Sequence, residues 1–257
     1  MPMRMPMSSP ALALSDLRAQ IARIEGDGGR TSRVLPFGLP DLDRRLPGGG
    51  LALGGLHEVA GGGNGTVDGA AATCFAAGIA ARLSGPVLWC VIAADLFAPG
   101  LAQVGLHPDR VIHVEAGDQT SVLACLEEGL RHGGLAAVVG EAPRLSMTAS
   151  RRLHLAAREA GTMGIALRRW RRPADTSDFG QPTAAMTRWR VSVLPSAPLP
   201  VPGVGRPCWL VELIRARAGE SFEMELEGCD ATGRLGVPAM LADRSAAAHG
   251  WERRATE

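Results

Sequence analysis

The sequence of 257 residues contains no lysine and no tyrosine, so all 27 of its basic residues are arginine. No reaction in this protein can therefore use a lysine ammonium, which excludes Schiff-base chemistry and a phosphate-binding lysine. The formal net charge is only +1. A generally basic surface for nucleic acid is thus excluded as well, and any DNA contact needs a local patch.

Signals for metal sites, disulfide bonds and membrane spans are also missing. The five cysteines form no Cys-x-x-Cys pair, and the six histidines are scattered without ligand or nucleophile spacing. We therefore predict no catalytic residue, no metal site and no disulfide framework. No apolar run reaches the roughly 18 residues of a membrane helix, and the N-terminus lacks the long apolar stretch of a signal peptide. We expect a cytoplasmic protein without membrane contact.

Strand and helix patterns alternate through the middle of the chain, which indicates an α/β fold with a mostly parallel sheet covered on both faces. The last third changes character, because its strand patterns have no long helices between them, and we expect these strands to extend the sheet, antiparallel in part. The predicted strands are 56–60, 87–93, 111–115, 135–139, 164–167, 189–194, 209–217 and 222–227. The predicted helices are 70–83, 98–104, 121–131 and 151–160, the last of them capped by Ser150.

An amphipathic stripe precedes this domain. Apolar residues recur there at spacings of three and four, after a Ser15 cap, and predict a short helix that either packs on its own domain or docks on a partner. The stripe consists of Leu14, Leu17, Ile21 and Ile24. We divide the chain into an N-terminal segment with this docking helix (1–28), one α/β domain (29–242) and a polar mobile tail (243–257).

A glycine-rich loop follows the first long strand and precedes a helix. Strand, glycine-rich loop and helix in this order are typical of a phosphate-binding loop, whose backbone N–H groups surround an anion. The loop residues are Gly61, Gly62, Gly63, Asn64, Gly65 and Thr66. We expect these glycines to be needed for positive φ angles and for close packing.

The chain resembles the RecA family along residues 33–230, and within it the ImuA proteins. The opening motif is LPFGLPDLDRRLPGGGLALGGLHEVAG; later stretches that match are LACLEEGLRHGGLAAVVGEAP, WLVELIRARAGE and the ending EGCDATGRLGVP. The residues that carry the opening match are Gly38, Leu42, Asp43, Gly48, Gly49, Gly50 and Glu58. The resemblance implies a RecA-like three-layer fold with a mostly parallel central sheet and a C-terminal antiparallel extension.

The chain departs from the family at the residues that handle ATP. Val67 stands at the position of the phosphate-binding lysine, and Asp68 at that of the magnesium-binding hydroxyl. Asp95 takes about the place of the family's water-positioning glutamate, and Gly140 or Glu141 that of the second magnesium-binding acid. Phosphoryl transfer depends on such cations. We therefore expect no ATP cofactor and no catalysis; nucleotide binding without turnover and active hydrolysis are the alternatives.

A basic cluster follows the strand at 164–167, where the resemblance places the second DNA-binding loop of RecA. Arginines on phosphates beside an aromatic stacking face suit a weak contact with single-stranded DNA. The alternative is a solvated strand end with Trp170 or Trp189 packed in the core. The candidate DNA contacts are Arg168, Arg169, Trp170, Arg171, Arg172 and Arg188. Arg215 and Arg217 are expected instead to pair across a hairpin with Glu223, Glu225 and Glu227.

The resemblance implies a function in the SOS response to DNA damage. It indicates a non-catalytic adaptor in translesion synthesis and mutagenesis, associated with the nucleoid, whose partners are an ImuB-like Y-family polymerase homologue, an error-prone replicative-type DNA polymerase and RecA. Two alternatives remain: a DNA-stimulated ATPase of the recombinase type and a cell-division inhibitor of the SulA type. ATP turnover stimulated by single-stranded DNA separates the ATPase from the adaptor.

Overall fold

A computed structural model describes residues 33–63, 65–170, 179–196, 203–217 and 219–238. The chain divides into two compact units, Met1–Arg33 and Val34–Glu257, and all described helices and strands belong to the second. The predicted docking helix on Leu14, Leu17, Ile21 and Ile24 and the predicted tail at 243–257 lie outside the described residues.

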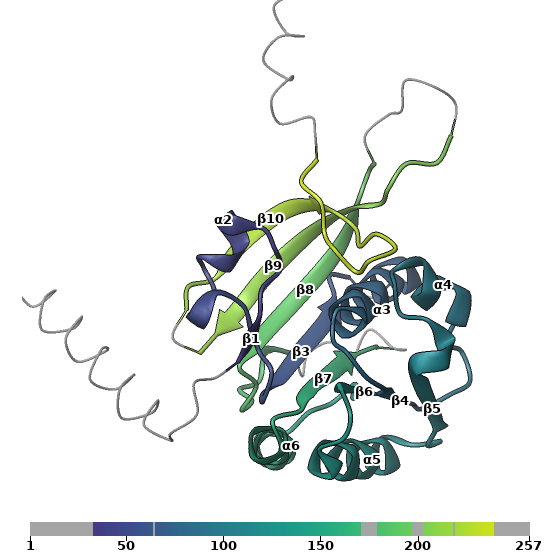
Figure 1. Ribbon diagram of the computed structural model, residues 1–257, viewed down its shortest axis with the longest axis vertical. Coiled ribbons are helices and arrows are strands. Elements are labelled where there is room, and N and C mark those ends of the chain that lie inside the picture. The colour runs from purple at the N-terminus through teal and green to yellow at the C-terminus, as the bar shows by residue number, and fades with distance from the viewer. Residues whose placement is uncertain (1–32, 64, 171–178, 197–202, 218, 239–257) are drawn as a thin grey trace, which may run out of the picture. The chain divides into compact units, whose positions relative to one another are not determined.

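An eight-stranded sheet forms the centre of the second unit, in the order β10-β9-β8-β3-β7-β6-β4-β5 (Figure 1). The strands from β3 to β8 pair in parallel, whereas β9 and β10 are antiparallel to their neighbours, as predicted. The strands are β3 (Leu56–Gly61), β4 (Val87–Val91), β5 (Val111–Glu115), β6 (Ala137–Glu141), β7 (Met163–Arg168), β8 (Thr187–Leu194), β9 (Cys208–Ala216) and β10 (Phe222–Glu227).

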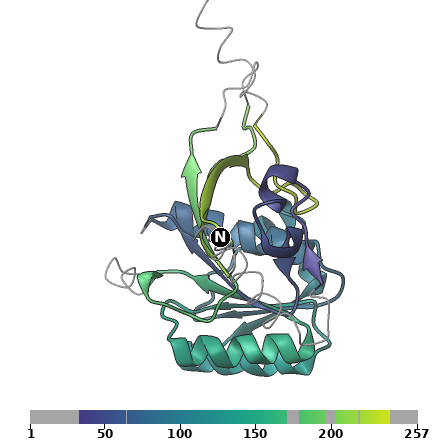
Figure 2. The same ribbon diagram turned by 90° about the vertical axis from the view of Figure 1, so that its left-hand side faces the viewer.

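Helices cover the two faces of this sheet and enclose two apolar cores. On one face α3 packs with an aromatic cluster of Phe37, Phe75 and Trp189. On the other face α5 and α6 pack through leucines such as Leu126 and Leu153. Figure 1 shows α5 and α6 side by side on one face of the sheet, with α3 on the other face. Figure 2 shows this helical layer from the side, beneath the sheet. The helices are α3 (Thr66–Ala81), α4 (Ala98–Gln103), α5 (Gln119–His132) and α6 (Met147–Ala160).

Short elements lead into the sheet, in a stretch rich in glycine and proline. The small sheet of β1 (Val34–Leu35) and β2 (Leu51–Ala52) frames α2 (Pro40–Asp43) and a 3-10 turn at Pro47–Gly49; a second 3-10 turn lies at Pro108–Arg110. The Asp43 carboxylate accepts hydrogen bonds from the backbone N–H groups of Phe37 at 2.7 Å and Gly38 at 2.9 Å. Asp43 is thus a loop anchor.

The cap of α6 differs from the prediction. Ser146, not Ser150, caps the helix, and its hydroxyl accepts a hydrogen bond from Ala149 N at 3.2 Å. Ser150 is buried inside the first turns, where its hydroxyl donates to Met147 O at 2.9 Å and accepts from Ala184 N at 2.9 Å. Ser146 lies directly after the strand–helix loop, so the helix begins one turn earlier than its apolar periodicity indicates.

The predicted pairing of Arg215 and Arg217 with the glutamates of β10 is wrong. The register places Glu223 opposite Glu212, and Arg190 of β8 takes Glu212 as its ion-pair partner at 2.5 Å. Arg215 instead donates to the backbone oxygen of Thr183 at 3.2 Å.

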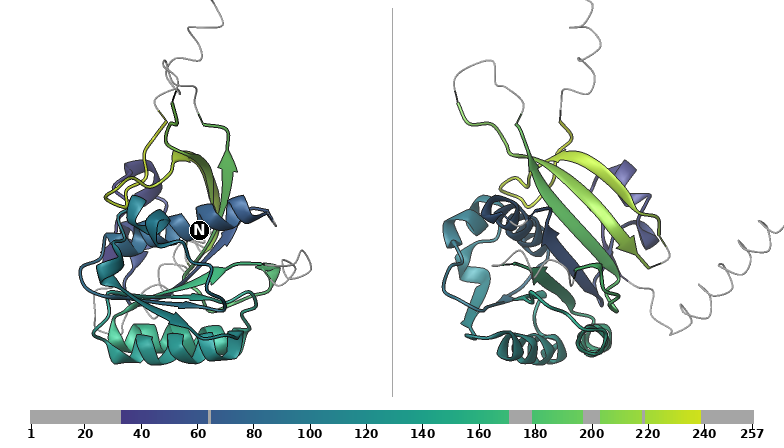
Figure 3. Two further views of the ribbon diagram at one scale, coloured as in Figure 1. Left: turned by 90° about the vertical axis from the view of Figure 1, so that its right-hand side faces the viewer. Right: turned by 180° about the vertical axis from the view of Figure 1, so that it is seen from behind.

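Strands β8, β9 and β10 are seen from behind in the right panel of Figure 3. None of the described helices is long and apolar enough to cross a membrane.

Candidate functional site

A pocket of about 490 Å³ lies at the carboxyl ends of the parallel strands. Ligands of open α/β sheets bind at this edge, because the loops that follow the strands converge there. The glycine-rich loop after β3 forms one wall, the segment after β4 a second, and the end of β7 a third. The lining residues include Gly61, Gly63, Gly65, Thr66, Cys74, Asp95, Leu96, Phe97, Arg168, Arg169 and Trp170.

The Asp68 carboxylate ties the glycine-rich loop to strand β8. One oxygen accepts a hydrogen bond from Gly63 N at 2.8 Å, and the other accepts one from Val193 N at 2.9 Å. Gly62 N in turn donates to Val191 O at 2.8 Å. Backbone donors of the kind that would surround a phosphate are therefore already engaged, one of them by a carboxylate of the chain itself. Val67, at the lysine position, is 64% exposed.

Two of the loop glycines, Gly61 and Gly62, are required for close packing, and none of the described loop glycines is required for positive φ. Gly61, Gly62, Gly63 and Gly65 all lie outside the left-handed region, so that part of the prediction is wrong. A Cβ atom on Gly62 would lie 1.8 Å from the Ser192 hydroxyl oxygen. A Cβ atom on Gly61 would lie 2.9 Å from the carbonyl carbon of Asp68. Two of the glycines thus allow the loop to lie against β8 and the start of α3.

Arg169 joins the two acids that match the family's catalytic positions. Its guanidinium contacts the Asp95 carboxylate at 3.0 and 3.2 Å and also pairs with Glu141. Glu141 is buried, and its other oxygen accepts a hydrogen bond from Ile92 N at 3.2 Å. Burial opposes the charge of Arg169, but the hydrogen bonds to Asp95 and Glu141 outweigh it and raise the pKa of the guanidinium. A fixed cation thus lies between these acids.

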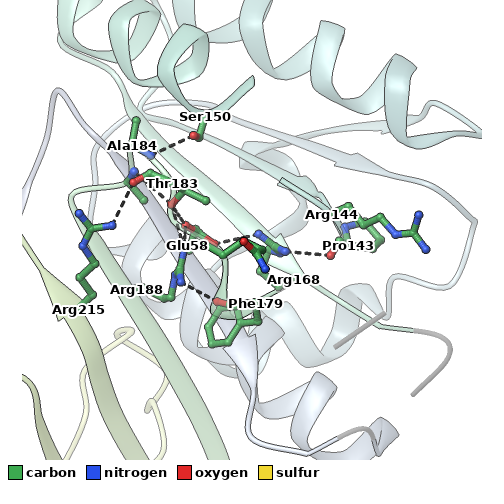
Figure 4. A network of polar contacts seen from close by, with 12 residues as sticks. Glu58, Pro143, Arg144, Ser150, Arg168, Phe179, Thr183, Ala184, Arg188 and Arg215 are labelled. Atoms are coloured by element: carbon green, nitrogen blue, oxygen red, sulfur yellow. Dashed lines mark hydrogen bonds and ion pairs between the residues drawn. The ribbon is translucent and has the colours of Figure 1, made fainter. Parts of the chain in front are cut away.

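Glu58 on β3 is the centre of a buried charge network (Figure 4). One carboxylate oxygen pairs with Arg168 at 2.9 Å, and the other pairs with Arg188 at 3.1 Å and accepts from the Thr183 hydroxyl. Glu58 lies opposite Ala166 of β7 and Arg188 of β8, so the parallel register brings the partners together from both sides. Glu58 thus joins β3 to β7 and β8.

Backbone oxygens and an aromatic ring complete the network. Arg168 donates to Pro143 O at 3.0 Å, and Arg188 donates to Phe179 O at 2.6 Å and Gln181 O at 2.8 Å. Both guanidinium groups lie over the Phe179 ring, at 5.8 and 5.1 Å from its centroid. These contacts fix the segment that leads into β8 against the sheet.

The structure corrects the predicted DNA-contact cluster. Arg168 and Arg188 are buried, so they are not available to DNA; they neutralise Glu58, which an apolar strand cannot hold alone. Arg169 faces the pocket, and the Trp170 indole N–H donates to Pro143 O at 3.2 Å. Trp189 lies in the core, as the alternative prediction stated. Arg171 and Arg172 lie outside the described residues.

No model of a known protein family matches the sequence. The chain is, however, 43% identical over 203 residues to Protein ImuA of Caulobacter vibrioides, in the sequences of two strains; the match covers 75% of this chain and 82% of that protein. The chain belongs to the ImuA family. The family predicted from the opening motif is thereby confirmed. The glycine-rich loop, Asp68 and Arg169 are therefore features of an ImuA-family chain.

A solved structure supports the fold prediction. The crystal structure of the RadB recombinase superposes with a TM-score of 0.54 at 18% sequence identity, over 79% of this chain and 99% of that one. This confirms the RecA-like α/β fold.

Asp68 as an anchor for the loop was not predicted from the sequence. The signal was present, because aspartate in the first turn of a helix is a residue type that accepts from free N–H groups.

Proposed function

We propose that this ImuA-family chain is a non-catalytic adaptor in SOS-induced translesion synthesis. It would use the RecA-like domain as a scaffold that holds polymerase components together in the cytoplasm, at the nucleoid of the damaged cell. The partners that the family implies are an ImuB-like Y-family polymerase homologue, an error-prone replicative-type DNA polymerase and RecA.

The observation that carries the proposal is that the charged groups in and around the pocket are already bonded to other groups of the chain. The Asp68 carboxylate engages Gly63 N, and Arg169 engages Asp95 and Glu141. The charged residues that line the pocket are Asp95, which is paired with Arg169, and Arg168, which is paired with Glu58. No lysine exists in the chain to take the place of these arginines at a triphosphate. Because phosphoryl transfer relies on positioned cations, this arrangement supports binding functions over catalysis.

The test of the cellular role is damage-induced mutation frequency in a strain deleted for this gene. We expect the frequency to fall in the deletion and to be restored by the wild-type protein. An Asp95→Asn/Glu141→Gln variant, which keeps side-chain volume, should restore it equally when expressed to the same level. An unchanged frequency in the deletion would remove the mutagenesis role, and failure of the variant alone would indicate that these acids have a function.

The test of the biochemical class is ATP turnover by the purified full-length protein, with and without single-stranded DNA. We expect no turnover in either case. Turnover stimulated by single-stranded DNA would support the recombinase-type ATPase instead.

The adaptor role itself is tested with a truncation that lacks residues 1–28. Since the predicted docking helix is in this segment, the truncated protein should fail to retain its polymerase partners, and undiminished binding would refute that assignment.

A further inference from the structure

An exposed stripe of alternating apolar and basic side chains runs along α6. Met147, Arg151, Leu155 and Arg158 follow one another at intervals of four, four and three residues, which places them on one face of the helix. Met147 is 40% exposed and Leu155 is 54% exposed. The opposite face of α6, which includes Leu153 and Ala157, packs into the core. The stripe is therefore the outer surface of the helix.

The arginines of this stripe have no acidic partner in the described part of the chain. No carboxylate among the described residues forms an ion pair with Arg151 or Arg158, although nearby arginines are paired. Arg152 and Arg131 both pair with Glu127 at 2.5 Å. The positive charge of Arg151 and Arg158 is thus balanced by no described side chain, next to two apolar side chains that no part of the described chain covers.

Two further arginines lie next to the stripe. The segment before β8 connects α6 to the end of β9, because Ala184 N donates to the Ser150 hydroxyl at 2.9 Å and Arg215 donates to Thr183 O at 3.2 Å. Arg217 N donates to Met186 O at 2.8 Å in the same segment. Both arginines are exposed, and they too form no ion pair with a described carboxylate.

Arg158 on α6 and Arg217 at the end of β9 both lie close enough to His154 to affect its charge. Burial lowers the pKa of His154 on α6, and the positive charges of Arg217 and Arg158 lower it further. Arg158 and Arg217 therefore act on the same side chain from two different elements. We use the name α6 face for the surface made by Met147, Arg151, Leu155, Arg158, Arg215 and Arg217.

We propose that the α6 face docks an acidic amphipathic segment of a partner protein. Apolar side chains of the segment cover Met147 and Leu155, and its carboxylates pair with the surrounding arginines. The spacing fits a helical segment, because Met147 and Leu155 are about two turns apart, on the order of 12 Å. The inference rests on the proposed adaptor function, to which it adds a docking site and the chemistry of the partner.

The composition of the surface favours a protein over nucleic acid. Sequence-independent binding of single strands combines basic side chains with aromatic rings on which the bases stack. The α6 face contains four arginines but no aromatic side chain, and its two exposed apolar residues are aliphatic. Aliphatic side chains between the arginines match the apolar side of an amphipathic helix. The arginines could pair with phosphates, but the surface has no aromatic ring on which a base could stack.

The experiment measures the fluorescence anisotropy of three labelled probes with the full-length protein. The first probe is a synthetic helical peptide rich in glutamate, with two leucines about two turns apart. The second is the same peptide with both leucines replaced by serine, and the third is oligo(dT). We expect the first probe to bind, the second to bind about tenfold or more weakly, and oligo(dT) not to bind comparably.

Variants assign the binding to the surface. Arg151→Glu/Arg158→Glu should weaken the first probe by about tenfold or more, since two attractions become repulsions. Leu155→Ser should also weaken it. Arg44→Glu changes an exposed arginine directly after α2, whose Leu42 packs in the core on the other side of the sheet, and should leave binding unchanged. All four positions are exposed, so the variants should fold, which circular dichroism verifies.

Three outcomes would overturn the proposal: equal binding by the charge-reversed variant, no binding of the first probe by wild type, or preferential binding of oligo(dT). Loss of the docking site is distinguishable from loss of the adaptor function. If the polymerase components are retained by wild type and equally by the Arg151→Glu/Arg158→Glu variant, the adaptor stands and this surface falls. If wild type retains no partner, the adaptor falls, whatever the peptide result.

Discussion

The Asp68 carboxylate on α3 accepts a hydrogen bond from the backbone N–H of Val193 on β8, at 2.9 Å. The two residues are 125 positions apart in the sequence. In a RecA-like site the start of this helix faces the nucleotide, whereas here it holds the end of strand β8. Stability and ligand binding at the glycine-rich loop should therefore both depend on Asp68.

Removal of the Asp68 carboxylate should destabilise the fold. Asp68→Ala leaves Gly63 N and Val193 N without their charged acceptor, and since both bonds are partly solvated we expect a loss of about 1–2 kcal/mol in the free energy of unfolding. Asp68→Asn retains one good acceptor oxygen and should lose less. Urea denaturation measures both. Asp109→Ala, at an exposed turn, is the control and should stay within about 0.5 kcal/mol of wild type.

Restoring the lysine alone should not restore a nucleotide site. In Val67→Lys the new ammonium would find the Asp68 carboxylate beside it, and Gly63 N would remain engaged. In Val67→Lys/Asp68→Thr the carboxylate is gone and a hydroxyl stands at the magnesium position. We expect the double variant to bind a fluorescent ADP analogue about tenfold or more tightly than the single variant. Equal affinities would mean that Asp68 does not block the site.

Alanine should lower the stability of the protein more at Gly62 than at Gly65, although both glycines are in the same loop. Gly62→Ala places a Cβ atom 1.8 Å from the Ser192 hydroxyl oxygen, so the loop or β8 must shift, at about 1–3 kcal/mol. Gly65→Ala meets no atom within 4 Å, so it should lose no packing, and the poorer N-cap preference of alanine at this position should cost about 1 kcal/mol or less. Ser192→Gly should recover much of the loss in Gly62→Ala. No recovery in this double variant would show that backbone strain and not this contact is responsible.

Glu58→Gln should be strongly destabilising. The change leaves the buried guanidinium groups of Arg168 and Arg188 without their counter-charge, which typically costs about 3–5 kcal/mol. Glu212→Gln removes the partner of Arg190 in a more exposed pair and should lose about 1 kcal/mol or less. Chemical denaturation of the two variants gives the comparison, and similar losses would contradict the role assigned to the Glu58 network.

Buried His57 should make the fold acid-sensitive. Burial lowers its pKa to about 4, and Nε2 lies 2.9 Å from Ala52 O while Nδ1 lies 2.7 Å from the Thr187 hydroxyl, which fits a neutral ring. The unfolded chain takes up the proton near pH 6.5. The unfolded state therefore binds more protons than the folded state between about pH 4 and 6.5. The free energy of unfolding decreases as the pH is lowered through this window, by up to about 3 kcal/mol.

The matched variant for this titration is His57→Gln, which has a donor and an acceptor but does not ionise. Its stability should depend less on pH than that of wild type between about pH 4 and 6.5, while the carboxylates act equally in both proteins. The difference between the two denaturation curves therefore isolates His57. A difference that stays constant over the window would refute the assignment.

Local patterns predicted the elements, because apolar periodicity and glycine positions act within a few residues of the chain. The strands β5 and β10 begin and end where predicted, and the helix after the glycine-rich loop begins four residues earlier, at Thr66. The ends that shifted depend on caps such as Ser146, whose partner N–H groups are fixed only once the preceding strand is placed.

The site was harder to predict, because it depends on the order of strands in the sheet. Arg168 and Arg188 appeared as parts of a basic surface cluster, yet the pairing of β3 with both β7 and β8 turns them inward onto Glu58. A glutamate inside an apolar strand is a signal for buried partners of opposite charge. It does not say which of the 27 arginines they are.

An anion that is part of the chain cannot be diluted. Free nucleotide holds a loop in proportion to its concentration, so the shape of an ordinary RecA-like site follows the supply of ATP and ADP. The Asp68 carboxylate is always present at the high effective concentration of an intramolecular group. We therefore expect this fold to keep one loop geometry in cells whose energy metabolism is failing.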